Sequence, residues 1–298
     1  MMTERVMPTR SEPGHAAARW LTGLTAVLLA GVSAAGLFVS GLYTDAAAVE
    51  AMFRGFDLVT LAVVAPMLGA SLLPGWRDRP AVQLVRLSLL AYGIYNYAYY
   101  LFGAQLNAAL LAHVAVFTAS LYALLLSLVA LDVPELASHF RRRTPVRTIT
   151  VIILLLALPL AAIQISGLAG FALAGTVPDE PSQLVVPLAF TRLGAVLDLS
   201  LLVPAYLLAA AWLWRRRAWG FLLSTIVLVA GALHQVSYMT AMLFQLSAEI
   251  PGAAFDVFEP PIVALFVIAS GLLLGNLRSQ RPPPAAQHEP ERRTRLAG

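Results

Sequence analysis

Hydrophobic residues occur along this chain in long, nearly uninterrupted runs that short polar segments separate. A helix rises about 1.5 Å per residue, so about 20 apolar residues cross the hydrocarbon core of a bilayer. Each run of that length therefore predicts one transmembrane helix. We expect the helices at residues 21–43, 57–74, 82–103, 106–131, 148–173, 195–214, 219–246 and 260–277. The fold class that this pattern predicts is all-α, a polytopic membrane bundle of about eight transmembrane helices.

The run at 57–74 is the weakest of these, because Pro66, Gly69 and Pro74 interrupt it. Proline is tolerated in a membrane helix where neighbouring groups satisfy the freed carbonyls, so we retain this span. The ends of the chain are polar. Residues 1–20 form an N-terminal segment, and the proline-rich tail at 279–298 is expected to be disordered.

Composition supports a membrane location. The chain is 59% hydrophobic and 12% charged, whereas soluble domains carry about 25% charged residues. There is no cysteine, which excludes disulfides, thiolate metal sites, cysteine nucleophiles and c-type haem attachment. All twenty basic residues are arginine, which excludes a Schiff-base lysine.

The arginines predict the orientation. With eight spans the loops alternate between two sides, and eighteen of the twenty arginines fall on one of them. The positive-inside rule then places both termini in the cytoplasm. Only Arg54 and Arg192 lie on the outer side. The all-arginine, alanine- and leucine-rich composition suggests a bacterium of high GC content, so we expect the bacterial inner (cell) membrane.

The chain also shows an internal similarity. A shift of 138 residues superposes Arg54–Asn107 on Arg192–Gln245 without a gap. The identities among rarer residues are Arg54 with Arg192, Pro66 with Pro204, Trp76 with Trp214, Gly93 with Gly231 and Tyr100 with Tyr238. A tryptophan beside a basic turn is common to many helical hairpins, but the matched outer arginines are not. We therefore predict two parallel four-helix repeats, 21–147 and 148–278, related by an axis along the membrane normal.

Polar residues form matching stripes on two of the predicted helices. Spacings of three, four and seven residues bring the members of each stripe to one helical face, which in hydrocarbon must meet protein or water. The stripes are Gly93, Asn96, Tyr97 and Tyr100 on one helix and Gly231, His234, Gln235 and Tyr238 on the other. With His113 they lie in the outer half of the membrane, which predicts a polar pocket open to the extracytoplasmic side.

Charged residues at the outer helix ends are candidates for the mouth of this pocket. They are Arg54, Asp57, Arg192, Asp198 and Glu259. Two guanidiniums beside a cleft would attract a carboxylate or phosphate. The alternative is ordinary interfacial placement, with Arg54 paired to Asp57 one turn away. Each buried amide or imidazole, taken alone, is equally explained as a hydrogen-bonded contact between helices.

Known catalytic signatures are absent from the sequence. His113 and His234, with Glu259 or Asp57, carry ligand chemistry for a metal or haem, but no H-E-x-x-H or H-x-x-x-H pair exists. Glycine-rich phosphate loops and G-x-S-x-G are also missing. We predict no metal and no cofactor. The expected partners are membrane lipids and a small-molecule or lipid ligand, and not nucleic acid.

Three functions fit these features. The first is a protein that transports or binds a small anionic or amphipathic molecule, which the stripes and the matched arginines favour. The second is an intramembrane enzyme that acts on a lipid or isoprenoid, with the outer carboxylates and histidines as acid and base. The third is a membrane assembly or scaffold subunit in which the buried polar groups only hold helices together.

Overall fold

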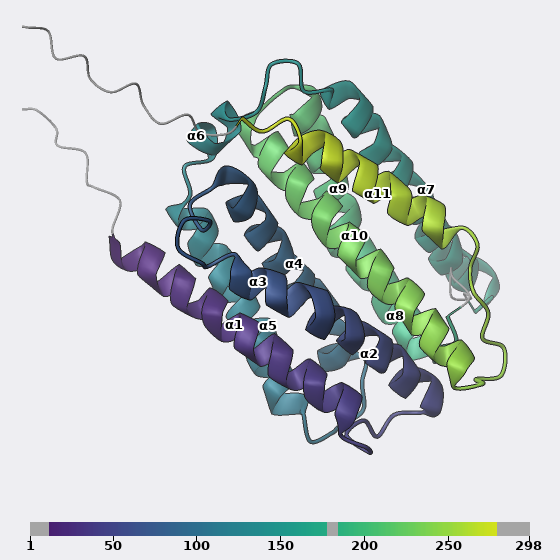
Figure 1. The fold of residues 1–298 in the computed structure, drawn as a ribbon. Helices are drawn as coiled ribbons and strands as arrows, with labels where there is room; N and C mark the ends of the chain where they lie inside the picture. The colour runs from purple at the N-terminus through teal and green to yellow at the C-terminus, as the bar shows by residue number, and fades with distance from the viewer. Residues whose placement is uncertain (1–11, 178–183, 279–298) are drawn as a thin grey trace, which may run out of the picture.

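The computed structural model describes residues 12–177 and 184–278, and these residues form a bundle of helices (Figure 1). Each predicted apolar run coincides with one helix or with one continuous set of helical segments. The segments are α1 (Glu12–Phe38), α2 (Ala47–Val59), the π-helical η1 (Thr60–Val64), α3 (Ala65–Ala70), α4 (Pro80–Phe102), α5 (Leu110–Ala130), α6 (Val133–Ser138), α7 (Val146–Ala174), α8 (Leu188–Leu197), the π-helical η2 (Asp198–Leu202), α9 (Val203–Trp214), α10 (Ala218–Ser247) and α11 (Glu259–Leu274).

Within the described ranges, 6 helices are long and apolar enough to cross a membrane. They are α1, α2–η1–α3, α5, α7, α8–η2–α9 and α10. α11 is apolar but has only 16 residues. α4 is long enough, but Arg86, Asn96 and several tyrosines make it more polar. The chain is thus all-helical over these residues, and its apolar helices are compatible with an integral membrane protein.

α2 and α8 are among the helices that begin well before the apolar runs that predicted them. The expected spans at 57–74 and 195–214 correspond to helices that start at Ala47 and Leu188. The additional turns carry charged residues, and a prediction based on runs of apolar residues leaves such turns out. In the first of these helices, for example, Arg54 forms an ion pair with Glu50 one turn earlier, so the polar turn is a stable continuation of the helix.

Both of these helices contain a π-helical segment of 5 residues just before a proline. The segments are η1 and η2, and the prolines are Pro66 and Pro204. Proline has no N–H to donate and its ring collides with the carbonyl four residues earlier. In a π-helical turn each N–H bonds to the carbonyl five residues earlier instead of four. This local change removes the conflict at the proline without ending the helix.

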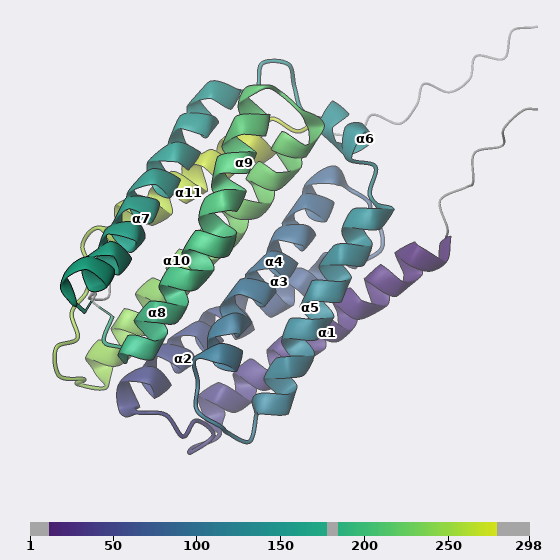
Figure 2. The same cartoon turned by 180° about the vertical axis from the view of Figure 1, so that it is seen from behind.

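The helices form two groups, which Figures 1 and 2 show from opposite sides. α1, α2–α3, α4 and α5 make one side of the bundle, and α7, α8–α9, α10 and α11 make the other. Each group contributes most of one buried apolar core, and both cores also include residues of the other group, such as Phe190 in the first core and Leu84 in the second. The long helix α10 joins them, because it packs against α2 and α4 of the first group as well as α9 and α11 of the second.

Both ends of the described chain lie at the same end of the bundle as α6, which we call the α6 end (Figure 1). Backbone hydrogen bonds fix the C-terminal side there: the Arg278 N–H donates to the His139 carbonyl, and the Arg141 N–H donates to the Asn276 carbonyl. His15 near the start of α1 lines a polar hollow together with His139. The arginine-rich turns that follow α3 and α9 are also at this end.

Candidate functional site

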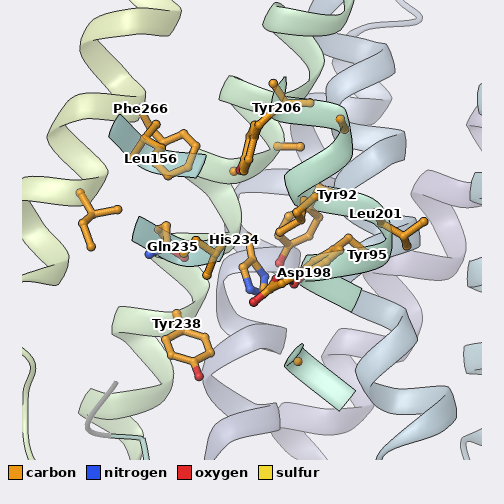
Figure 3. A pocket seen from close by; sticks show the side chains of 18 of the residues that line it. Tyr92, Tyr95, Leu156, Asp198, Leu201, Tyr206, His234, Gln235, Tyr238 and Phe266 are labelled. Carbon is orange, nitrogen blue, oxygen red and sulfur yellow. The ribbon is translucent and has the colours of Figure 1, made fainter. Parts of the chain in front are cut away.

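A cavity of about 670 Å³ lies where the second group of helices meets the first, between α4 of the first group and α7, α8–α9, α10 and α11 of the second. Its size is typical of a small-molecule site. The wall nearer the α6 end is apolar and includes Leu156, Leu223 and Phe266. The polar groups lie further along the same helices, toward the opposite end of the bundle (Figure 3).

Asp198 is the buried carboxylate of this cavity. It is the first residue of η2 and is 8% exposed. Its oxygens accept two hydrogen bonds from neutral donors: the hydroxyl of Tyr95 at 2.6 Å and the amide of Gln164 at 2.8 Å. These donors come from α4 and α7, so the carboxylate connects three helices. No described arginine forms an ion pair with it.

His234 lies beside that carboxylate in a group of aromatic rings (Figure 3). Its imidazole meets the ring of Tyr95 edge-on, with centroids 4.8 Å apart, and is stacked with Tyr99 at 5.9 Å. Its Nδ1 atom is buried and has no hydrogen-bond partner among the described residues. A polar atom of this kind at a cavity wall is suited to contact a ligand.

A second carboxylate, that of Glu259, lies across the cavity at the start of α11. Gln235 of α10 donates its amide to this carboxylate at 2.6 Å. Tyr238, one turn further along α10, also lines the cavity. Asp256 in the preceding loop brings a third carboxylate to the wall. In the described part of the chain, no cluster of three or more histidine, aspartate and glutamate side chains is arranged to hold a metal ion.

The predicted stripe on α10 lines the cavity completely: Gly231, His234, Gln235 and Tyr238 are all on its wall. The predicted stripe on α4 does not. The polar residues of α4 that reach the wall are instead Tyr92, Tyr95 and Tyr99, which occupy the neighbouring face of the helix. Tyr92, Tyr95 and Tyr99 are themselves spaced three and four residues apart. This spacing is the sequence signal that could have identified them as one face of α4.

Asn96, Tyr97, Tyr100 and His113 are buried in the first group of helices and not on the cavity wall. The expectation that they meet the α10 stripe in one cavity is therefore corrected. The space that they occupy is filled by aromatic rings, among them Tyr43 from the loop before α2. We call Tyr43, Asp57, Tyr97, Tyr100 and His113 the tyrosine cluster.

Asp57 is the fully buried centre of the tyrosine cluster. The hydroxyl of Tyr43 donates to one of its oxygens at 2.6 Å and that of Tyr100 to the other at 3.1 Å. Tyr97 shares a hydrogen bond of 3.2 Å with Ser33 of α1. His113 packs against Tyr100 with ring centroids 4.8 Å apart, and neither of its ring nitrogens has a described hydrogen-bond partner. Asn96 is likewise without one.

The two arginines predicted on the outer side, Arg54 and Arg192, do not line the cavity. Arg54 forms an ion pair with Glu50 at 2.8 Å on the same helix, so the pairing with Asp57 considered from the sequence is wrong. Arg192 is exposed on α8. Of the five residues expected at a pocket mouth, Asp198 and Glu259 are on the wall, and Arg54, Asp57 and Arg192 are elsewhere.

Comparisons with models of known protein families, with curated proteins and with solved structures found no match. The fold and the site therefore define only a class: over residues 12–177 and 184–278, an all-helical protein with apolar helices suited to a membrane and a ligand-sized cavity.

Proposed function

We propose that the protein is an integral membrane protein that binds or transports a small amphipathic molecule, which occupies the cavity between α4 and the second group of helices. The supporting observation is the cavity itself, with apolar walls nearer the α6 end and convergent polar groups further along. Such a site would bury the apolar part of a ligand and orient its polar part. Because neither outer arginine is on the wall, the geometry favours an amphipathic ligand over the anionic one expected from the sequence.

A cavity-filling substitution tests this function. Ala205 of α9 lines the cavity, so the Ala205→Phe side chain would occupy part of it. We expect native mass spectrometry of the purified chain, supplied with a panel of neutral and charged amphipathic molecules, to show an adduct of one ligand per chain. Ala205→Phe should lose that adduct.

The matched control is Ala211→Phe. Ala211 lies on the same helix, but it is exposed and off the cavity wall. A phenylalanine there adds the same apolar area without entering the cavity, and the adduct should persist. If no panel member forms an adduct, or if both variants behave alike, the cavity is not a binding site.

The proposed membrane arrangement has eight crossing helices, including α4 and α11, with the α6 end in the cytoplasm of a bacterial inner membrane. The described arginines at that end support this orientation, since basic loops remain on the cytoplasmic side. At the opposite end the described arginines are Arg54 and Arg192.

Thiol labelling tests the orientation, and the chain has no cysteine that would add background. Thr176 follows α7 at the outer end, and Ser138 ends α6; both are exposed. In intact cells, an impermeant maleimide should label Thr176→Cys and not Ser138→Cys. After the membrane is opened, both should react. Labelling of Ser138→Cys in intact cells would contradict the proposed orientation.

We also propose that the two halves descend from one duplicated unit. Support comes from features that recur 138 residues apart: η1 and η2 begin at Thr60 and Asp198, and α4 and α10 begin at Pro80 and Ala218. α4 and α10 also pack against each other, as symmetry mates near a common axis would. The same offset relates both prolines that follow the π segments.

A further inference from the structure

The charges on the cavity wall are of one sign. Three carboxylates line it, those of Asp198, Asp256 and Glu259, and no described arginine does so. The chain has no lysine that could contribute a positive charge from elsewhere. A ligand with a negative group would approach like charges in a space of low dielectric constant, which is unfavourable. A ligand with a positive group would meet opposite charges.

Asp198 is a buried carboxylate that forms no ion pair with a described arginine. Both hydrogen bonds to its oxygens come from neutral groups, Tyr95 and Gln164, which orient the carboxylate without neutralising it. Ionisable side chains inside a membrane are costly, and they generally pair with another charge or serve a function. Among the described residues no arginine supplies that charge, so a cation inside the cavity would complete the pair.

The aromatic residues around this carboxylate suit the same kind of ligand. Tyr92, Tyr95, Tyr99 and Tyr238 line the wall beside His234. A cation held over the face of an aromatic ring is attracted by the ring quadrupole, and cages of such rings recognise quaternary ammonium groups. The remaining wall is apolar and would receive hydrocarbon or aromatic substituents of the ligand.

We propose that the cavity binds a lipophilic organic cation, with Asp198 as its counter-charge and the surrounding tyrosines as its cage. This inference rests on the proposed binding function and names the ligand class. Its basis is the combination of a ligand-sized cavity, a carboxylate whose described partners are neutral, and a described wall without arginine.

Two ions of equal shape and opposite charge provide the test. Tetraphenylphosphonium and tetraphenylborate differ in charge while their four phenyl groups are alike, so apolar burial contributes similarly to both. Binding of each ion to the purified full-length protein in a non-ionic detergent is measured by equilibrium dialysis. We expect saturable binding of the phosphonium ion at least about tenfold tighter than that of the borate. Equal binding of both ions, or tighter binding of the borate, would overturn the proposal.

Asp198→Asn removes the charge and keeps the shape of the side chain. It should weaken phosphonium binding at least about tenfold, and Asp198→Glu should restore part of it. The matched control is Asp57→Asn, because Asp57 is also buried and also accepts hydrogen bonds from two neutral side chains, but it is not on the cavity wall. This control should bind the phosphonium ion like the unchanged protein. Asp198→Asn with unchanged affinity overturns the counter-charge role.

The outcomes separate the two proposals. If neither ion binds but a neutral amphipathic molecule forms an adduct that Ala205→Phe abolishes, the cation inference fails and the binding function stands. If no probe of any charge binds, the binding function itself fails. Should Asp198→Asn not fold, the comparison of the two ions on the unchanged protein still decides the charge preference.

Discussion

Replacement of Gly55 by alanine should strongly destabilise the protein, because two helix backbones meet at this glycine. A Cβ atom on Gly55 of α2 would lie 2.5 Å from the Cα and 2.6 Å from the backbone N of Ala241 on α10. No side chain can move aside, so the helices themselves must separate. Overpacking of a buried contact costs about 1–3 kcal/mol, and more where the backbone must shift. We expect a cost at or above the upper figure, measured as a lower melting temperature in detergent.

Gly69→Ala is the matched control, on α3 of the same continuous helical set Ala47–Ala70. A Cβ atom there would meet nothing within 4 Å. Since alanine favours a helix over glycine by about 0.5–1 kcal/mol, this variant should be neutral or slightly more stable. The two glycine substitutions should thus differ in sign. If Gly55→Ala melts with the unchanged protein, α2 and α10 do not approach this closely.

The close approach at Gly55 also explains why small residues recur on α2. Ala51 lies one turn before Gly55 and is buried, a spacing that lets membrane helices pack backbone to backbone. The contact positions Phe56, which meets the ring of His234 with centroids 6.0 Å apart. A shift of α2 would therefore also disturb the wall of the cavity. A stability defect and a binding defect are expected together in Gly55→Ala.

The apolar runs predicted the helices well because burial in lipid or protein requires long apolar segments. They failed at helix starts, where polar residues such as Arg54 continue a helix through local ion pairs. The sequence did indicate an interruption at Pro66. It did not indicate a π-helical segment, because that outcome depends on whether neighbouring helices hold the two ends of the interrupted helix in line.

The sequence placed two polar stripes at one pocket. The α10 stripe does border a cavity. The matched α4 stripe does not, since Tyr43 and His113 fill the corresponding space with rings. Tyr43 lies in a loop, and no periodicity on α4 reveals that a distant loop residue will enter. Under the proposed duplication, one half would have kept the cavity and the other would have closed it with aromatic side chains.

Gly36→Ala is the second substitution with a large expected effect, and it acts on a hydrogen-bond network rather than on a helix contact. A Cβ atom on Gly36 of α1 would overlap the carboxylate of Asp57 and the hydroxyl of Tyr43, and would lie 2.8 Å from the Asp57 Cγ. The carboxylate cannot move without loss of its bonds to Tyr43 and Tyr100. Each buried polar group left unsatisfied costs about 1–3 kcal/mol, so we expect a large fall in melting temperature.

Two comparisons isolate that cause. Gly31→Ala lies on the same helix with nothing within 4 Å of the added carbon, and it should melt like the unchanged protein or slightly higher. In an Asp57→Ala background the carboxylate is absent, so Gly36→Ala should cost much less than it does alone. Contacting residues show such coupling energies of about 0.5–3 kcal/mol in double-mutant cycles. If the two costs simply add, Gly36 does not act through Asp57, and the glycine is needed for another reason.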